Sequence, residues 1–279
     1  METWDKEKIK QSKTNLEGAD LKGMDLSSID LKNANLISAN LTSADLSGAD
    51  LSGANLFSVK AMRANFENTN LSGATLQKTN LTRANFEGAN LNSADLMGAN
   101  LSQAILAGSN LIRASLVEAS LLEADLTGAD LTEAKLSGRY TREGIFSRGA
   151  NLRKGKLAGA KMVRADLVAA ELNETDCRDV DFSGANLSEA SLKKACLVST
   201  CFVNSKLGDA DFRSSELTDS DFSGAELIEA KFQGVDLRKV KNISPQELEL
   251  STIDSNTQIP DYIEVIWTSE DTYECRQKV

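Results

Sequence analysis

Large apolar side chains return every five residues through most of the 279-residue chain. Each is usually preceded by Asp or Asn, and that residue by a small side chain, as in Ala19-Asp20-Leu21. These three positions point inward, outward and inward, which is the alternation of an extended strand. A heptad helix is excluded, because its apolar period is about 3.5 residues. The pattern predicts a repeat of short extended segments, each centred on a Leu or Phe.

The two residues after each central Leu or Phe must turn the chain. Glycine gathers at the second of them, where 14 of the 18 glycines stand. The third residue of a type II turn has a positive φ, which glycine adopts at the least cost. We therefore expect each five-residue unit to form one short side and one tight corner. The outward Asp or Asn has a structural interpretation, because its short side chain can hydrogen-bond the nearby backbone.

The unit resembles the A(D/N)LXX motif of the pentapeptide-repeat family, over roughly residues 14–239. The resemblance implies an all-β fold, a right-handed quadrilateral β-helix with four units per coil and the small and central residues packed inside. The family is abundant in cyanobacteria and other bacteria. The 45 units of this sequence would make about eleven coils and a rod about 50 Å long, at a strand spacing of about 4.8 Å.

The phenylalanines provide a separate test of four units per coil, because stacked residues would then lie twenty positions apart. Several central phenylalanines have this spacing, and we expect them to form aromatic ladders in a narrow core. The ladder residues are Phe66, Phe86, Phe182, Phe202, Phe222, Phe212 and Phe232. Phe182 and Phe212 are thirty positions apart, which predicts that their columns lie on opposite faces.

A solenoid exposes strand edges at both ends, and these need covering. The charged N-terminal residues predict a short cap, with a helix as its candidate form. Ser244-Pro245-Gln246-Glu247 is typical of a helix start, so we expect a helix over about 245–251. Residues 262–267 predict a strand or an apolar flap that either caps the last coil or binds a partner, with the cap favoured. We expect the charged tail after Trp267 to be loose.

The spacing of five breaks once, between Phe146 and Leu152, where one residue is inserted. The unit centred on Thr141 is also weak. A bulge in a continuous helix is favoured over a hinge, because both flanking arrays keep the same spacing. The predicted organisation is a cap at 1–13, a first array at 14–138, a junction at 139–151, a second array at 152–239 continuous with the first, and a C-terminal cap and tail at 240–279.

Composition narrows the setting of the chain. The net charge of −10 and the pI of about 4.8 argue against non-specific binding to nucleic acid. No apolar run approaches membrane-spanning length, and the first ten residues lack the apolar core of a signal peptide. The four cysteines form no CxxC pair, so they predict neither a disulfide framework nor a zinc site. We expect a cytoplasmic, reducing environment.

Catalytic chemistry has few candidates here. The chain has no histidine, which removes the usual general base and metal ligand, and no phosphate-binding glycine motif. Cys177 is a central residue and should be buried and inert. Cys196 and Cys201 should face outward, and the column of Asp181, Cys201 and Asp221 is a weak metal candidate. We expect no enzyme, no catalytic residue, no cofactor and no metal.

Basic residues gather between two acidic segments. Residues 139–164 hold eight basic side chains against Glu143 alone. A solvated ring spread over all four faces is favoured over an anion-binding surface. The candidate interaction residues from this belt and from the C-terminal segment are Arg142, Arg148, Arg153, Lys154, Lys156, Lys161, Arg164, Tyr262 and Trp267.

These observations lead to three hypotheses for the function of the chain. The favoured one is a non-enzymatic scaffold that binds a protein partner, as a monomer or an end-to-end dimer, without direct contact to nucleic acid or membrane. The resemblance also implies an alternative, since some members of the family inhibit DNA gyrase by presenting a DNA-like acidic rod. The basic belt and the lack of long projecting loops count against this alternative. The third is an adaptor that binds an anionic partner through the belt.

Overall fold

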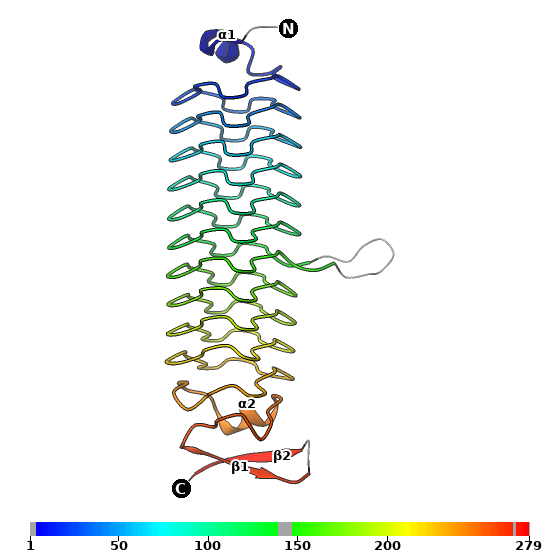
Figure 1. Ribbon diagram of the computed structural model, residues 1–279, viewed down its shortest axis with the longest axis vertical. Helices are drawn as coiled ribbons and strands as arrows, with labels where there is room; N and C mark the ends of the chain where they lie inside the picture. The colour runs from blue at the N-terminus through cyan, green and yellow to red at the C-terminus, as the bar shows by residue number, and fades with distance from the viewer. Residues whose placement is uncertain (1–3, 139–146, 270–271, 279) are drawn as a thin grey trace.

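The computed structural model describes residues 4–138, 147–269 and 272–278. Stacked coils form one straight rod (Figure 1). Helix α1, Lys6–Gln11, lies at one end. Helix α2, Pro245–Glu249, and a hairpin of strands β1, Ile263–Trp267, and β2, Tyr273–Gln277, lie at the other. The rod therefore has a different kind of cap at each end.

A parallel backbone ladder joins each coil to the next. Residues at the outward position pair with the residue twenty positions on, as in Asp20 with Asn40 and Asn40 with Lys60. The amide of Leu41 donates to the carbonyl of Lys60 at 2.7 Å, and the amide of Lys60 donates back to Ala39 at 3.0 Å. A coil is thus four five-residue units, and each unit contributes a short rung rather than a long strand.

Most corners are hydrogen-bonded turns with a left-handed third residue. In the first unit the amide of Ala19 donates to the carbonyl of Leu16 at 3.1 Å, and Gly18 between them has φ of 64°. Many corners hold another residue in the same conformation, such as Glu123 with φ of 58°. The left-handed region costs such a residue conformational energy. The ladder offsets that cost, because the Glu123 amide donates to the next coil at 2.9 Å.

The outward Asp and Asn side chains support the corners. The Asp45 carboxylate accepts from the amide of Ser47 at 3.0 Å, two residues along the chain. Asn side chains also bridge coils, since the Asn65 amide donates to Asp45 at 3.0 Å and the Asn85 amide donates to Asn65 at 3.2 Å. This hydrogen bonding explains why the repeat selects Asp or Asn at this position.

The phenylalanines stack along the core. The ring centroids of Phe66 and Phe86 lie 4.7 Å apart in near-parallel planes. Phe202 stacks between its neighbours in the same column at 5.5 and 4.9 Å. Its ring also meets Phe212 from the other phenylalanine column at 5.7 Å and a right angle. The core is therefore narrow enough for the two columns to touch. Three further rings complete these stacks: Phe182, Phe222 and Phe232.

The insertion between the arrays is larger than its sequence spacing suggests. Ser120 pairs with Asn151 in the ladder, a step of 31 residues where most rungs are twenty residues apart. The Ala150 amide donates to the Leu136 carbonyl at 2.6 Å, so the coil continues directly from 136 to 150. The prediction of a one-residue bulge is wrong, because the chain has eleven more residues between these rungs than between most others. Eleven residues equal two five-residue units plus one residue. In the sequence the insertion therefore resembles a one-residue break between two arrays with a spacing of five.

The predicted units centred on Thr141 and Phe146 lie outside the described residues. The ladder itself is unbroken across the insertion, because Lys135 pairs with Asp166 on the following side. The two arrays are therefore one continuous stack in the described residues, and the expectation that the coils carry no long insertion is also wrong. The backbone pairs of the ladder align one coil with the next. They do not fix how many residues the chain has between two pairs.

Capping side chains begin both helices. The Asp5 side chain accepts from the Lys8 amide at 2.8 Å, and Ile9 of α1 is buried against the first coil. Ser244 accepts from the Glu247 amide at 3.0 Å, and Pro245 occupies the first turn of α2. Both patterns satisfy amides that a helix start leaves without a partner.

The tail after Trp267 is not loose, contrary to the sequence prediction. It forms β2, which pairs antiparallel with β1. The hydroxyl of Tyr273 donates to the carbonyl of Ser251 at 2.6 Å, and the Cys275 amide donates to the carboxylate of Glu249 at 3.0 Å. These bonds anchor the hairpin to α2, so the C-terminal cap is an ordered layer on the last coil.

Carboxylates replace backbone carbonyls where the ladder ends. The Leu227 amide donates to the Glu247 side chain at 3.1 Å, and the Gly234 amide donates to Asp254 at 2.9 Å. Burial acts to raise the pKa of Asp254, but hydrogen bonds from Gly234, Thr257 and Asn256 outweigh it and lower the pKa from its ordinary value. The ionised carboxylate therefore seals one edge of the rod.

Phe202→Ala should lower the free energy of unfolding by about 3–5 kcal/mol, because it leaves a cavity between stacked rings. Urea denaturation followed by circular dichroism measures the change. Ile105→Ala is the matched control, since Ile105 lies exposed on an outer face, and it should shift stability by less than about 0.5 kcal/mol. Equal effects of the two substitutions would contradict the stacked core.

Asp254→Ala should remove the shorter of the two hydrogen bonds of the Gly234 amide, whose second acceptor is Thr257 Oγ1 at 3.3 Å, while leaving the central coils intact. We expect hydrogen exchange at Gly234 to accelerate on the order of tenfold, because a hydrogen bond contributes about 1 kcal/mol. In the unaltered chain the same protection is present above an ordinary Asp pKa of 3.8 and is lost as the pH falls through the lowered folded pKa. Asp261→Ala is the control, and unchanged exchange in Asp254→Ala would disprove the capping role.

Candidate functional site

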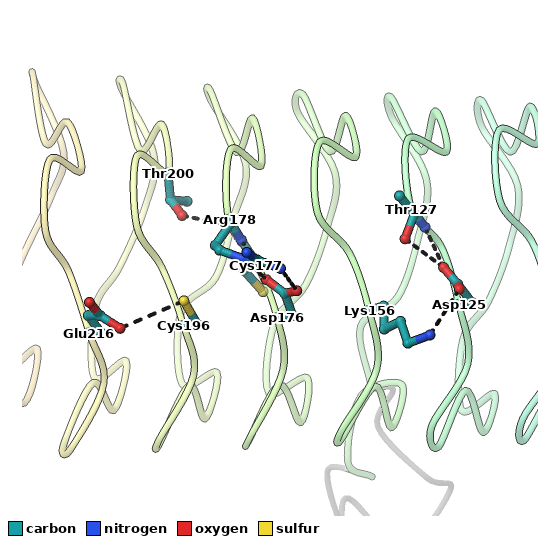
Figure 2. A network of polar contacts seen from close by, with 9 residues as sticks. All are labelled: Asp125, Thr127, Lys156, Asp176, Cys177, Arg178, Cys196, Thr200 and Glu216. Atoms are coloured by element: carbon teal, nitrogen blue, oxygen red, sulfur yellow. Dashed lines mark hydrogen bonds and ion pairs between the residues drawn. The ribbon is translucent and has the colours of Figure 1, made fainter.

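Outward charges lie in columns, because each rung places one residue beside its counterpart on the next coil. On the face drawn in Figure 2, Asp125, Lys156, Asp176, Cys196 and Glu216 occupy successive rungs. The Lys156 ammonium lies 3.4 Å from the Asp125 carboxylate. This column mixes both signs of charge, so adjacent rungs partly neutralise each other.

The thiol in this column is not activated. The Cys196 sulfur lies 3.9 Å from a carboxylate oxygen of Glu216, and burial raises the pKa of the thiol. The Arg178 guanidinium donates two hydrogen bonds to the Asp176 carboxylate, at 2.8 and 2.6 Å. These bonds hold the pKa of that carboxyl below its ordinary value. A protonated thiol beside a carboxylate is a poor nucleophile.

The other cysteines do not provide a reactive site either. Cys177 lies fully inside the core, where burial raises its pKa to about 12. Asp181, Cys201 and Asp221 stack on successive rungs, as their spacing predicts, and the Cys201 sulfur lies 3.2 Å from the Ser183 hydroxyl. Within the described part of the chain, no group of three or more Cys, Asp or Glu is placed to hold a metal ion.

The basic belt is divided among the sides of the rod. Arg153 and Lys154 stand at one corner, whereas Lys156 and Lys161 occupy the outward columns of the next two sides. Arg142 lies outside the described residues. A partner that contacts one flat face would therefore meet only part of the belt.

Carboxylates also pair with belt cations. Arg148 lies 2.6 Å from Glu171, and Arg164 lies 2.7 Å from Glu133. Glu133 accepts from Arg113 on its other side at 2.7 Å, and this bond lowers the pKa of Glu133. Arg148, Lys156 and Arg164 thus belong to local ion pairs, and Lys161 stands in a column with Asp130 and Asp181, whereas no ion pair of Arg153 or Lys154 is found among the described residues.

Tyr262 and Trp267 both belong to the C-terminal cap. The Tyr262 hydroxyl donates to the Ile243 carbonyl at 3.1 Å, and burial raises its pKa. Trp267 ends β1 with 40% of its surface exposed, and its ring centroid lies 5.1 Å from that of Tyr273. Ile263 at the start of β1 is buried in the core. The segment therefore covers the rod end and still leaves Tyr262 and Trp267 partly exposed to solvent.

Two apolar side chains form an exposed pair near this cap. Ile228 and Leu250 are 56% and 51% exposed, the highest values among large apolar side chains of the described residues. The Glu229 amide donates to the Leu250 carbonyl at 2.8 Å, in the same way that the Asp209 amide donates to the Ile228 carbonyl at 2.9 Å. Ile228 and Leu250 therefore occupy consecutive rungs of one corner, about 4.8 Å apart.

Carboxylates border this apolar pair. Glu189, Asp209 and Glu229 stand on successive coils at the second position of the same corner, each exposed and with φ of 58–60°. Glu249, next to Leu250, is exposed as well. The corner thus presents an apolar centre with an acidic border, and we call Ile228, Leu250 and these four carboxylates the C-terminal ridge.

Sequence reasoning did not identify the ridge. A signal was present at Ile228, which fills a corner position that is often Ser or Thr elsewhere in the repeat. Leu250 was expected to continue the helix predicted over about 245–251, but α2 ends at Glu249 and Leu250 is its C-cap. The sequence alone does not show that these two residues, 22 positions apart, become neighbours.

No helix among residues 4–138, 147–269 and 272–278 has the length and apolar character needed to cross a membrane. Comparison with protein families gives a match to the model for pentapeptide repeats, with eight copies, over residues 14–53, 64–103, 104–138, 170–209 and 205–241. A search of curated proteins finds no match.

Solved structures of repeat proteins are similar to this chain. HetL, a pentapeptide repeat protein involved in heterocyst differentiation regulation from the cyanobacterium Nostoc sp. strain PCC 7120, shares 28% identity over 79% of this chain and 92% of its own, with a TM-score of 0.48. Trypsin-treated QnrB1, a plasmid-mediated fluoroquinolone resistance protein, shares 20% identity over 66% and 83%, with a TM-score of 0.35. A pentapeptide repeat protein of the Arabidopsis thaliana thylakoid lumen shares 25% over 47% and 69%, with a TM-score of 0.21.

The burial of Cys177 predicts a graded response of the thiols to alkylation. In the folded protein Cys201 should react with iodoacetamide, whereas Cys177 should react only after denaturation, as peptide mass spectrometry would record.

The raised pKa of Cys177 also means that the free energy of unfolding falls as the pH rises from about 9 toward about 12, because only the unfolded thiol ionises there. Cys177→Ala should flatten this decline, and an equal decline in both proteins would contradict the assignment.

Proposed function

Because the chain belongs to the pentapeptide-repeat family, we propose that it is a non-enzymatic interaction module that docks a protein partner on its C-terminal ridge. The proposal takes the rod as a right-handed β-helix of about eleven coils at about 4.8 Å each, working in the cytoplasm. Its stacked coils provide a rigid support, and the ridge provides the contact.

The observation that carries the proposal is the exposure of Ile228 and Leu250 on adjacent rungs. Single exposed apolar residues are ordinary on a protein surface, but adjacent ones suggest a contact site. Full burial of such a side chain contributes roughly 1.5–3 kcal/mol, and about half of that remains available at each residue. A partner that covers both would gain a small apolar anchor on a rigid support.

The acidic border defines the chemistry of the partner. Glu189, Asp209 and Glu229 form a column beside the apolar pair, Glu249 precedes Leu250, and no ion pair involving any of the four is found among the described residues. A complementary segment therefore has apolar residues flanked by Lys or Arg. Such charges steer the encounter and exclude acidic competitors.

The two alternatives stay as hypotheses with less support. Mimicry of DNA to inhibit gyrase needs an extended acidic surface, and the mixed columns around Lys156 and Lys161 interrupt it. An anion-binding adaptor needs the belt charges to act together, but Arg148 and Arg164 face carboxylates. Docking on the C-terminal ridge requires neither an uninterrupted acidic surface nor unpaired belt cations.

Ile228→Ser with Leu250→Ser should reduce partner binding by at least about tenfold. Serine often fills the corner position of Ile228, as at Ser27 and Ser47, so the fold should survive. A photo-crosslinking residue at position 229, used in a lysate of the source organism, would identify the partner. Binding of the purified partner to the unaltered and substituted chains then gives the change in Kd.

Met62→Ser with Ile105→Ser is the matched control, because these residues are also exposed and apolar but lie away from the ridge. This control should bind like the unaltered chain. Undiminished binding of the ridge variant would reject the proposal. Capture of a topoisomerase that ignores the ridge substitutions would instead favour the mimicry alternative.

A further inference from the structure

A cleft of about 700 Å³ opens at the C-terminal end, between the last coil and the hairpin cap. Its walls come from the coil corner after Phe232, from the loop that follows α2, and from the end of β1. The lining residues are Gln233, Thr252, Ile253, Asp254, Ser255, Trp267 and Ser269. Asp254 is the one charged residue among them, so the cleft has a negative wall.

Gln233 gives the cleft an unsatisfied acceptor. Its side-chain oxygen Oε1 is buried and has no hydrogen-bond partner, and no other side-chain oxygen or nitrogen of the described residues has this status. A buried acceptor without a donor costs about 1–3 kcal/mol. The terminal torsion of glutamine is broad, so the amide can turn toward a donor that enters the cleft.

Asp254 and Trp267 add charge and an aromatic surface. Asp254 Oδ1 is fixed by the amides of Gly234 and Asn256, at 2.9 and 3.1 Å. Trp267 is 40% exposed, and Tyr273 packs 5.1 Å away at a tilt of 60°. The indole is therefore supported from one direction and accessible from another.

We propose that this cleft binds an arginine side chain of the protein segment that docks on the C-terminal ridge. A guanidinium is planar, carries several donors and stacks on aromatic rings. It would donate to Gln233 Oε1, face the Asp254 carboxylate and lie against Trp267. This inference rests on the proposed function only in taking the partner to be a protein. The preference for a guanidinium is argued from the residues of the cleft alone.

The test uses N-acetyl-arginine amide as the probe and N-acetyl-citrulline amide as its neutral, nearly isosteric control. Trp4 and Trp267 are the two tryptophans of the chain, so Trp4→Phe leaves Trp267 as the only indole reporter. The full-length Trp4→Phe protein is titrated at constant ionic strength while Trp267 fluorescence is followed. We expect saturable quenching by the arginine probe, with the citrulline probe at least about tenfold weaker, as for a loss of about 1.4 kcal/mol. Equal responses, or none, would overturn the proposal.

Two substitutions separate binding from structure. Gln233→Met removes the unsatisfied acceptor, so it should raise the melting temperature of the empty protein while weakening the arginine probe several-fold. Asp254→Asn retains an oxygen for the Gly234 amide and should also weaken the arginine probe, leaving citrulline unchanged. Probe binding that survives both substitutions would refute the assignment. Because these titrations contain no partner, a failure here leaves the ridge crosslinking result to decide the proposed function separately.

Discussion

The parallel hydrogen-bond ladder between coils is the interaction on which the rest of the structure depends. Each outward residue donates to and accepts from the coil before it, as Lys60 does with Ala39 and Leu41, while its two chain neighbours bond to the coil after it. One coil alone would leave these groups without partners, and a buried backbone group without a partner is costly. The stack is therefore cooperative between neighbours, and both of its ends require a cap. At the C-terminal end the carboxylates of Glu247 and Asp254 take over the role of missing carbonyls.

The ladder also decides which side chains meet. Phenylalanines twenty positions apart become stacked rings, and outward residues become columns about one strand spacing apart. Like charges in such a column would repel, whereas Asn65 donates to Asp45 and Lys156 approaches Asp125. In these two columns neighbouring coils carry complementary groups, whereas Asp25 with Asp45 and the acidic side chains of the C-terminal ridge place like charges on successive coils. A run of basic residues in the sequence is distributed over several sides of the rod.

The repeat constrains most of the surface, and freedom returns where it ends. Inside the array each outward side chain has a role at a corner or in a column. The apolar pair of the C-terminal ridge and the cleft lie near the point where the last coil meets α2 and the hairpin. Ile228 and Leu250 can be exposed there, and Gln233 can keep an unsatisfied oxygen. A region that carries such costs without a folding benefit is a reasonable place for recognition.

The sequence by itself determined the repeat, because inward and outward positions alternate with a fixed period of five and stacking requires a period of twenty. It also contained the start of α2, since Ser244 and Pro245 act within a few residues of each other. It did not determine the size of the insertion before Ala150, because removing two units and one residue leaves the spacing intact. It gave no account of β2, whose stability depends on Tyr273 and Cys275 reaching α2. The ridge and the cleft were decided only by the tertiary structure. Their residues lie about one coil apart along the chain, and only the ladder between coils makes them neighbours in space.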